Sequence, residues 1–299
     1  MSETAKPAPG STNHTDVCPL LVIGGGSMAS AILSGAAGAD LLDGPCVVAE
    51  PDAETRRSIG ALSPSIDAVE SIADAFDALP YEDATVLLAV KPQMLATVAQ
   101  EIEASLGGAM LENRCVISIL AGVPIEKLKD TLKARIVRVM PNLPISVGMG
   151  ATAMSGGPDA TGEDLDRAHR LFGAASVVYD LPESAIDAFT AAAGSGPAYA
   201  FLLAEAMAMG AMEAGGDTGL NEEATRAIIA QTLKGAAEML ARPCNGELAD
   251  PAALRTAVTS KGGTTAAALD VLEARGVKDA VREAVLAAAK RAGELARGD

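Results

Sequence analysis

Aromatic side chains are scarce in this sequence of 299 residues: they make up 2% of it, and tryptophan is absent. Because 49% of the residues are nevertheless hydrophobic, alanine, leucine, valine and methionine must fill the core. Such a composition favours helices, since alanine is the best helix former. A core with few aromatic rings buries little area per residue, and assembly into oligomers is one way to make up that deficit.

The residues that build metal and redox centres are also few. The sequence has two histidines, neither within a motif, and four widely spaced cysteines with no CxxC pair. We interpret the cysteines as buried, reduced thiols of a cytoplasmic protein and predict no metal site. Basic residues are outnumbered by acidic ones. The net charge of −16 argues against a nucleic-acid partner, because a phosphate backbone is repelled by that field.

Long apolar runs are missing as well. Residues 1–16 are polar, contain proline and have no apolar stretch, so we expect a disordered tail rather than a targeting segment. The most apolar later stretch, 201–214, is interrupted by Glu205 and Glu213 and is too short to span a bilayer. We therefore expect no membrane partner.

The first half of the chain alternates short apolar runs with helix-like segments. This alternation predicts parallel strands joined by right-handed crossovers, and continuous apolar strands indicate helices on both faces, as in a doubly wound α/β domain. We expect that domain over residues 17–181. The runs that predict its strands cover residues 21–26, 46–50, 85–90, 115–120, 135–140 and 176–180.

The chain from residue 182 to residue 299 has a different texture. No convincing strand is visible there, and helical patterns are separated by glycine-containing breaks, so we predict an all-helical domain over 182–299. The helix predicted at 197–214 is apolar nearly all the way round and must be buried on every side. Burial inside one domain and burial at a subunit interface both meet that need, and we favour the interface.

A glycine-rich loop follows the first predicted strand and opens a helix. Gly24, Gly26 and Ala29 form the pattern GxGxxA, with Ser27 and Met28 between them. The first glycine allows the turn, and the second lets the backbone approach a pyrophosphate. The helix N-terminus then supplies N–H donors and partial positive charge. We predict that these residues bind the pyrophosphate of NADPH or NADH.

Glu50, at the end of the second predicted strand, bears on the choice between these coenzymes. A carboxylate here normally accepts hydrogen bonds from the ribose hydroxyls of NADH and repels the 2′-phosphate of NADPH. Arg56 and Arg57 follow closely and either lie on the surface or approach a 2′-phosphate. The residues alone lean to NADH.

Further motifs carry a resemblance to a known family. From Leu20 to Leu295 the chain resembles pyrroline-5-carboxylate reductase, in motifs whose order and spacing fit that family. The motifs are IGGGSMASAI (23–32), AVKPQ (89–93), SILAGVPIEKL (118–128), RVMPNLP (138–144), GSGPAYAF (194–201) and AVTSKGGTTAAALDVLE (257–273).

The resemblance implies an enzyme of proline biosynthesis that reduces the cyclic imine 1-pyrroline-5-carboxylate to L-proline with NADPH or NADH. It implies a Rossmann-type domain followed by an all-α domain that forms a homodimer and often assembles further. It also implies a set of cofactor-binding residues at the carboxyl ends of two later strands. These are Ala89, Val90, Lys91 and Pro92 after one strand and, beside the nicotinamide ring, Met140, Pro141 and Asn142 after the other. Lys91 is either a catalytic acid or a cofactor contact, and we favour the contact. For Asn142 the alternative is a turn-capping residue.

The same resemblance places the substrate on the segment 260–265. Gly262 and Gly263 expose backbone N–H groups before a helix, which suits a carboxylate, and Ser260, Thr264 and Thr265 complete the predicted site. Thr265 is expected to hydrogen-bond the ring nitrogen and so to act in catalysis. For Thr264 the alternative is ordinary helix capping.

Position 261 departs from the family pattern. The family usually has proline there, whereas this chain has Lys261. This lysine either attracts the substrate carboxylate or points to solvent, and we favour solvent. The backbone donors of the two glycines remain in either case.

The sequence argues against two alternative functions. A β-hydroxyacid dehydrogenase would have a lysine, with an asparagine one turn on, in the helix that follows the glycine turn 194–196. The sequence PAYAFLLAEAMAMG has neither. A non-catalytic NAD(P)-sensing protein would need no carboxylate site such as 260–265.

Overall fold

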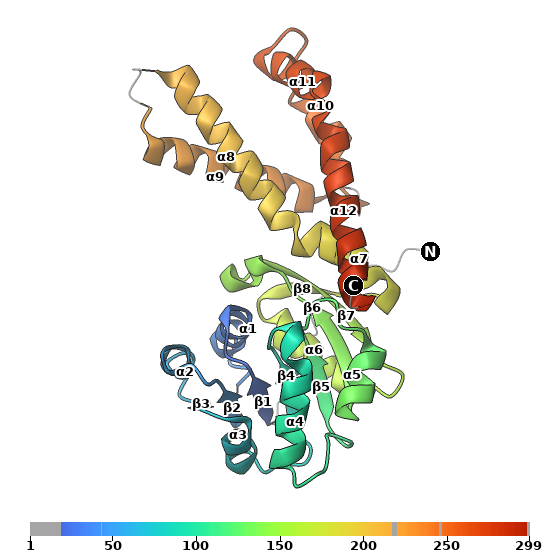
Figure 1. Ribbon diagram of the computed structural model, residues 1–299. Coiled ribbons are helices and arrows are strands. Elements are labelled where there is room, and N and C mark those ends of the chain that lie inside the picture. The colour runs from blue at the N-terminus through green and yellow to red at the C-terminus, as the bar shows by residue number, and fades with distance from the viewer. Residues whose placement is uncertain (1–18, 43, 217–219, 245–246, 298–299) are drawn as a thin grey trace. The chain divides into compact units, whose positions relative to one another are not determined.

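The structure, a computed structural model, describes residues 19–42, 44–216, 220–244 and 247–297 (Figure 1). The predicted tail, residues 1–16, lies outside these ranges. The chain divides into two compact units: one runs to Ser195 and includes the chain from Ala288 onward, and the other runs from Gly196 to Ala287. The boundary predicted between residues 181 and 182 follows the last strand of the first unit, and it stays a prediction.

One eight-stranded sheet forms the centre of the first unit. Its order is β3-β2-β1-β4-β5-β6-β7-β8, and all neighbours are parallel except β6 and β7. The jump from β2-β1 to β4 is the change of direction that opens a ligand crevice in doubly wound sheets. The strands are β1 (Leu20–Ile23), β2 (Cys46–Ala49), β3 (Ile66–Val69), β4 (Thr85–Leu88), β5 (Cys115–Ser118), β6 (Arg135–Met140), β7 (Gly150–Gly156) and β8 (Ser176–Asp180).

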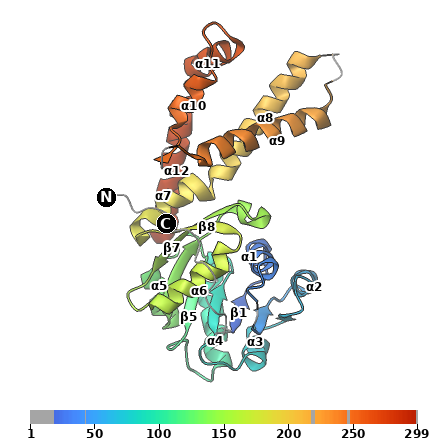
Figure 2. The ribbon, with the colours of Figure 1, turned by 180° about the vertical axis from the view of Figure 1, so that it is seen from behind.

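Helices cover both faces of this sheet. The side chains of β1, β2, β4 and β5 are buried throughout, because each face carries its own apolar core. One core lies under α3 (Ile72–Ala78), α4 (Leu95–Ser105) and α5 (Ile125–Leu132), and the other under α1 (Ser27–Gly38), α2 (Ala53–Gly60) and α6 (Gly162–Gly173). Figures 1 and 2 show the two faces in turn. The predicted doubly wound fold is confirmed.

Short helical segments follow three of the strands. η1 (Pro92–Met94) comes after β4, and η2 (Leu143–Val147) comes after β6. After β8 come η3 (Glu183–Ala185), α7 (Ile186–Phe189) and the π-helix η4 (Thr190–Gly194). Single π-helical turns are rare and occur frequently at functional sites.

The second unit is helical. It contains α8 (Gly196–Gly215), α9 (Glu222–Ala241), α10 (Pro251–Ala257), α11 (Thr264–Ala274) and the first part of α12 (Val277–Arg297). The expectation that no strand follows residue 182 was wrong: β9 (Pro243–Cys244) and β10 (Glu247–Leu248) pair antiparallel. These strands are two residues long and carry no apolar periodicity that a sequence pattern would reveal.

Much apolar surface of the second unit stays uncovered within one chain. No residue of α8 is buried, so this helix is not enclosed within a single domain. Surface of this kind marks a protein interface. The exposed apolar side chains of α8 and α9 include Phe201, Leu202, Leu203, Met209, Met212, Ile228 and Met239.

Within the described ranges, none of the helices has the length and apolar character that crossing a membrane requires. Nor do three or more His, Cys, Asp or Glu side chains within those ranges group as metal ligands would.

Candidate functional site

The structure brings the predicted cofactor segments of the first unit to one edge of the sheet. Strands β1, β2, β4, β5 and β6 are mutually parallel, so the loops that follow them open on the same side. Gly24 has a φ of +97°, and a Cβ at this position would lie 2.8 Å from the carbonyl oxygen of Ala89. Only glycine fits there, and the glycine loop and the AVKP segment are therefore in contact.

The glycine loop ends at a helix whose N-terminus is open. Gly26 is the N-cap residue of α1, and it makes no side-chain capping bond. The first turn carries no acidic residue, and Gly26 and Ser27 are exposed, whereas Ala29 is buried beneath the helix. The unpaired N–H groups of such a turn, with the helix dipole behind them, suit a phosphate group. A cradle that a Cβ would fill and an uncapped helix both fit a dinucleotide.

Glu50 directly follows the last residue of β2, and its side chain reaches the glycine loop. Its Oε2 accepts a hydrogen bond from the N–H of Gly25 at 2.8 Å, and its Oε1 accepts one from the N–H of Asp52 at 2.9 Å. Arg56 donates to the carbonyl oxygens of Glu50 and Pro51, at 2.8 and 2.9 Å. The sequence could not show these contacts, because they depend on how the loop and the strand end meet.

The AVKP segment turns from β4 into η1. Ala89 and Val90 are half-buried, Lys91 is the N-cap residue of η1, and Pro92 is its first residue. The Lys91 side chain is exposed, and within the described ranges its ammonium group makes no ion pair. It is thus available to a ligand at this edge.

Asn142 is buried and uses its side chain inside the protein. With 7% of its surface exposed, it donates from Nδ2 to the carbonyl oxygen of Ala193 at 3.0 Å, and its Oδ1 accepts from the N–H of Ala151 at 2.9 Å. Met140 contacts the same π-helix: a Cβ on Gly194 would lie 3.3 Å from Met140 Cε. The MPN and GSGPA motifs therefore meet in space.

Arg138 was not among the residues predicted for the site. Its guanidinium is buried, and Nη1 donates to Glu183 Oε1 at 2.9 Å. The same carboxylate oxygen accepts from the N–H of Ile125 at 2.7 Å, and Asp187 Oδ1 lies 3.9 Å from Nη2. Arg138, Met140 and Asn142 alternate along the chain, and all three contact the segment 183–194.

The predicted substrate segment lies in the second unit, between α10 and α11. Gly262 has a φ of +69°, which favours glycine, and a Cβ on Gly263 would lie 2.4 Å from Ser260 Oγ, so a larger residue there would make the serine hydroxyl move. Gly263 is the N-cap residue of α11, which has no side-chain capping bond. Thr264 is therefore inside the helix rather than capping it, Thr265 is half-buried, and the first N–H groups remain open to an anion.

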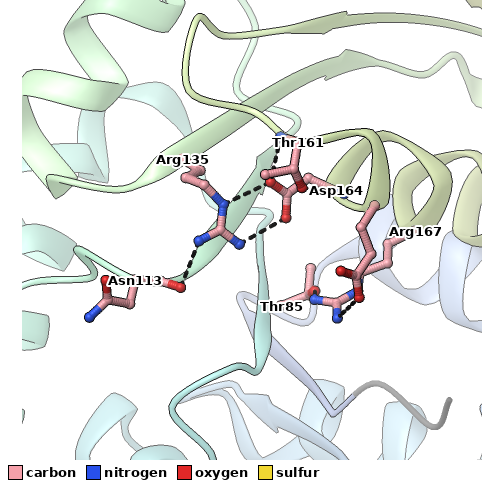
Figure 3. A network of polar contacts seen from close by, with 7 residues as sticks. Thr85, Asn113, Arg135, Thr161, Asp164 and Arg167 are labelled. Atoms are coloured by element: carbon pink, nitrogen blue, oxygen red, sulfur yellow. Dashed lines mark hydrogen bonds and ion pairs between the residues drawn. The ribbon is translucent and has the colours of Figure 1, made fainter.

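A polar network at the opposite edge of the sheet belongs to the scaffold (Figure 3). Arg135, the first residue of β6, donates to both oxygens of buried Asp164 at 2.8 and 2.9 Å and to the carbonyl oxygen of Asn113 at 2.8 Å. Burial alone would raise the pKa of Asp164, but hydrogen bonds from Arg135 and Thr161 outweigh it and lower that pKa. The network joins β6 to α6.

The two described free cysteines are unreactive parts of the same core. Burial raises the pKa of the Cys46 thiol to about 12. Burial, together with the neighbouring Asp164 carboxylate, also raises the pKa of Cys115. Both side chains therefore stay protonated at neutral pH and neither is a nucleophile.

Comparison with known proteins covers nearly the whole chain. A family model for pyrroline-5-carboxylate reductase dimerisation matches residues 183–295, and one described as NADP oxidoreductase, coenzyme F420-dependent, matches residues 19–122. The pyrroline-5-carboxylate reductase of Mycobacterium tuberculosis is 38% identical over 296 residues, with 92% of this chain and 96% of the relative covered. That of Pseudomonas aeruginosa is 36% identical over 278 residues, with 92% and 95% covered.

Solved structures show the same likeness. A pyrroline-5-carboxylate reductase from Coxiella burnetii matches with a TM-score of 0.78 at 30% identity, covering 94% of this chain and 99% of the other. The pyrroline carboxylate reductase of Plasmodium falciparum, solved with NADP bound, matches with a TM-score of 0.76 at 26% identity, covering 93% and 98%.

Proposed function

The chain belongs to the pyrroline-5-carboxylate reductase family, and we propose that it reduces 1-pyrroline-5-carboxylate to L-proline, the last step of proline biosynthesis. It is an NAD(P)H-dependent oxidoreductase with a Rossmann-type domain and a helical dimerisation domain. The observation that carries the proposal is the contact between the glycine loop and the AVKP segment at one edge of the sheet, in a chain that matches these reductases along its length.

Coenzyme binding is assigned to the loops at that edge. Gly24, Gly26, Ser27, Met28 and Ala29 would hold the pyrophosphate, and the open N-terminus of α1 supports this. The nicotinamide half would follow two segments: Ala89 to Pro92, and Met140 to Asn142. When bound, the coenzyme supplies the hydride that adds to the carbon of the C=N bond.

Substrate binding is assigned to the turn before α11. The N–H groups beyond Gly262 and Gly263 would hold the carboxylate, with Ser260 and Thr264 beside them, and the absence of a capping side chain on α11 supports this. The hydroxyl of Thr265 would hydrogen-bond the ring nitrogen and so orient the imine, while solvent supplies the proton to that nitrogen. Lys91 would contact the coenzyme rather than act as the acid.

The dimerisation domain makes the chain a homo-oligomer. We assign the subunit contact to α8, because its apolar side chains are exposed in one chain, and we take a dimer as the basic unit. The proposal includes a cytoplasmic location, which the buried thiols of Cys46 and Cys115 support, and no nucleic-acid partner.

The test is steady-state oxidation of NADH and NADPH by 1-pyrroline-5-carboxylate, with Thr265→Ala, Thr265→Ser and Thr264→Ala as variants. Losing a hydrogen bond to a charged group costs about 1.5–3 kcal/mol, so Thr265→Ala should lower turnover about a hundredfold. Coenzyme affinity should stay within about twofold. Thr265→Ser should retain most activity. Full turnover by Thr265→Ala would remove this residue from catalysis.

The assay also separates the other two functions. Oxidation of a β-hydroxyacid by NAD⁺, without reduction of the pyrroline, would favour a β-hydroxyacid dehydrogenase. Coenzyme binding with no turnover of either substrate would favour an NAD(P)-sensing protein.

A further inference from the structure

The end of β2 holds a carboxylate against the glycine loop. Glu50 is half-buried, and each of its oxygens accepts a backbone hydrogen bond, one from Gly25 at 2.8 Å and one from Asp52 at 2.9 Å. Each oxygen keeps a second lone pair for a ligand hydroxyl. Because both bonds come from backbone N–H groups, the negative charge is fixed in place before any coenzyme arrives.

Gly25 makes this arrangement possible. A Cβ at that position would lie 3.1 Å from Glu50 Cβ and 3.3 Å from Oε2, closer than side chains ordinarily pack. The loop and the acid are therefore fitted to each other. A ligand that needed the carboxylate to move away would also have to disturb the glycine loop.

We propose that the chain uses NADH in preference to NADPH and that Glu50 makes this choice. In doubly wound domains an acid at this place hydrogen-bonds the ribose 2′-hydroxyl, whereas a nearby arginine accommodates a 2′-phosphate. The inference rests on the proposed function only for where the adenosine half of the coenzyme lies. It extends that function by naming the coenzyme.

Arg56, the cation next to this site, is already engaged. Its Nη1 donates to the carbonyl oxygens of Glu50 and Pro51. Its Nη2 lies 3.4 Å from Glu70 Oε2. The guanidinium thus braces the backbone at the end of β2, with both Nη1 hydrogens committed to carbonyl oxygens.

Asp52, a second acid near the end of β2, also opposes a phosphate. Asp52 caps α2 by accepting from the N–H of Thr55 at 2.8 Å, and that backbone bond lowers the pKa of its carboxyl. A second negative charge therefore stands beside Glu50 at neutral pH. Arg57 is exposed and makes no ion pair with any described residue, so it serves as the comparison residue in the test.

The experiment measures the dissociation constants of NADH and NADPH by fluorescence, and kcat/KM for each coenzyme, on the full-length protein. A carboxylate a few ångströms from the 2′-phosphate of NADPH repels it, so NADH should be favoured about tenfold or more. Glu50→Gln should shift that ratio toward NADPH about tenfold. Arg57→Gln should change it less than about threefold.

Preference of the wild type for NADPH, in binding and in kcat/KM, would overturn the proposal, as would an unchanged ratio in Glu50→Gln. Since that variant disturbs the glycine loop, competition against bound NADH by 5′-AMP and by 2′,5′-ADP is measured on the wild type as well. Stronger competition by 5′-AMP supports the inference, and stronger competition by 2′,5′-ADP contradicts it. The binding assays need no pyrroline substrate, so a wrong substrate assignment leaves them decisive.

Discussion

Helices α1 and α8 are both rich in alanine and other apolar residues, yet they differ in how far their side chains are buried. In α1 the side chains of Ala29, Ile32, Leu33 and Ala36 are buried against the sheet. In α8 no side chain is buried, and Phe201 is 62% exposed. The first unit, which holds the sheet (the sheet unit), thus completes its own core. The second unit, which is helical (the helical unit), leaves apolar surface for a second copy of the chain. Coenzyme binding and assembly should therefore respond to different substitutions.

Phe201→Asp should have the largest effect, and on assembly alone. Burying a phenylalanine contributes about 2–3 kcal/mol, and a two-fold interface loses it twice, so the dissociation constant should rise about a thousandfold or more. Sedimentation equilibrium measures this. Tyr81→Asp, which changes an exposed aromatic residue of the sheet unit, is the control and should leave the mass unchanged. An unchanged oligomer in Phe201→Asp would break the comparison.

Asn142→Leu should weaken the sheet unit instead. The substitution leaves the N–H of Ala151 and the carbonyl oxygen of Ala193 without their partner, at about 1–3 kcal/mol each. The free energy of unfolding should fall by about 3 kcal/mol in urea denaturation. Asn113→Leu, at an exposed side chain of the same unit, should change it by less than about 0.5 kcal/mol. Equal effects would refute a specific role for the Asn142 bonds.

Acid should act on the sheet unit through Asp164. Its pKa is lowered in the folded state, so above about pH 4 its full contribution is present. As the pH falls below that value the unfolded chain binds the proton first, and the contribution is lost. Asp164→Asn should cost about 2 kcal/mol at pH 7, and the difference from wild type should shrink below about pH 4.

Asp166→Asn is the control for that series, because Asp166 is exposed on the same helix. It should follow the wild-type curve of unfolding free energy against pH. A difference between wild type and Asp164→Asn that grew on acidification would contradict the assigned sign.

The smallest effect is expected at Lys261, which is exposed in the second unit. If the side chain faces solvent, Lys261→Gln and Lys261→Pro should each raise KM for the pyrroline by less than about twofold. Neither should change assembly or unfolding. A fivefold rise in KM that disappears at high salt would instead place the ammonium on the substrate carboxylate.

The sequence predicted the parts of the fold that follow a short-range rule. Buried parallel strands are continuous apolar runs, so β1, β2, β4 and β5 were found, and the glycine loop was read from its spacing. β3 and β7 were missed for physical reasons. β3 has an exposed Asp67 at the edge of the sheet. β7 begins and ends with glycine, has small residues at every remaining position except Met154, and is antiparallel to β6.

In the candidate site, too, the sequence predicted the local motifs but not the contacts between distant residues. The residues that the motifs name lie on the expected loops, but their partners are remote in sequence. Asn142 bonds Ala193, Glu50 bonds Gly25, and Arg138 bonds Glu183, and each partner comes from another element. Such pairs follow from tertiary packing, which no local pattern encodes. The proposed preference for NADH over NADPH depends on one of them, the bond between Glu50 and Gly25.

The path of the chain has a consequence for how the protein can be divided. It leaves the sheet unit after Ser195 and returns at Ala288, in the middle of α12, where Ala292 is again buried. In genetic terms the helical unit is an insertion rather than an appendage. A stop codon after Ser195 would not release an intact coenzyme-binding half, since the last turns of α12 would be lost with the rest. A minimal coenzyme-binding unit would need residue 195 rejoined to residue 288. A C-terminal truncation should first destabilise the sheet unit, although most of that unit is encoded at the opposite end of the gene.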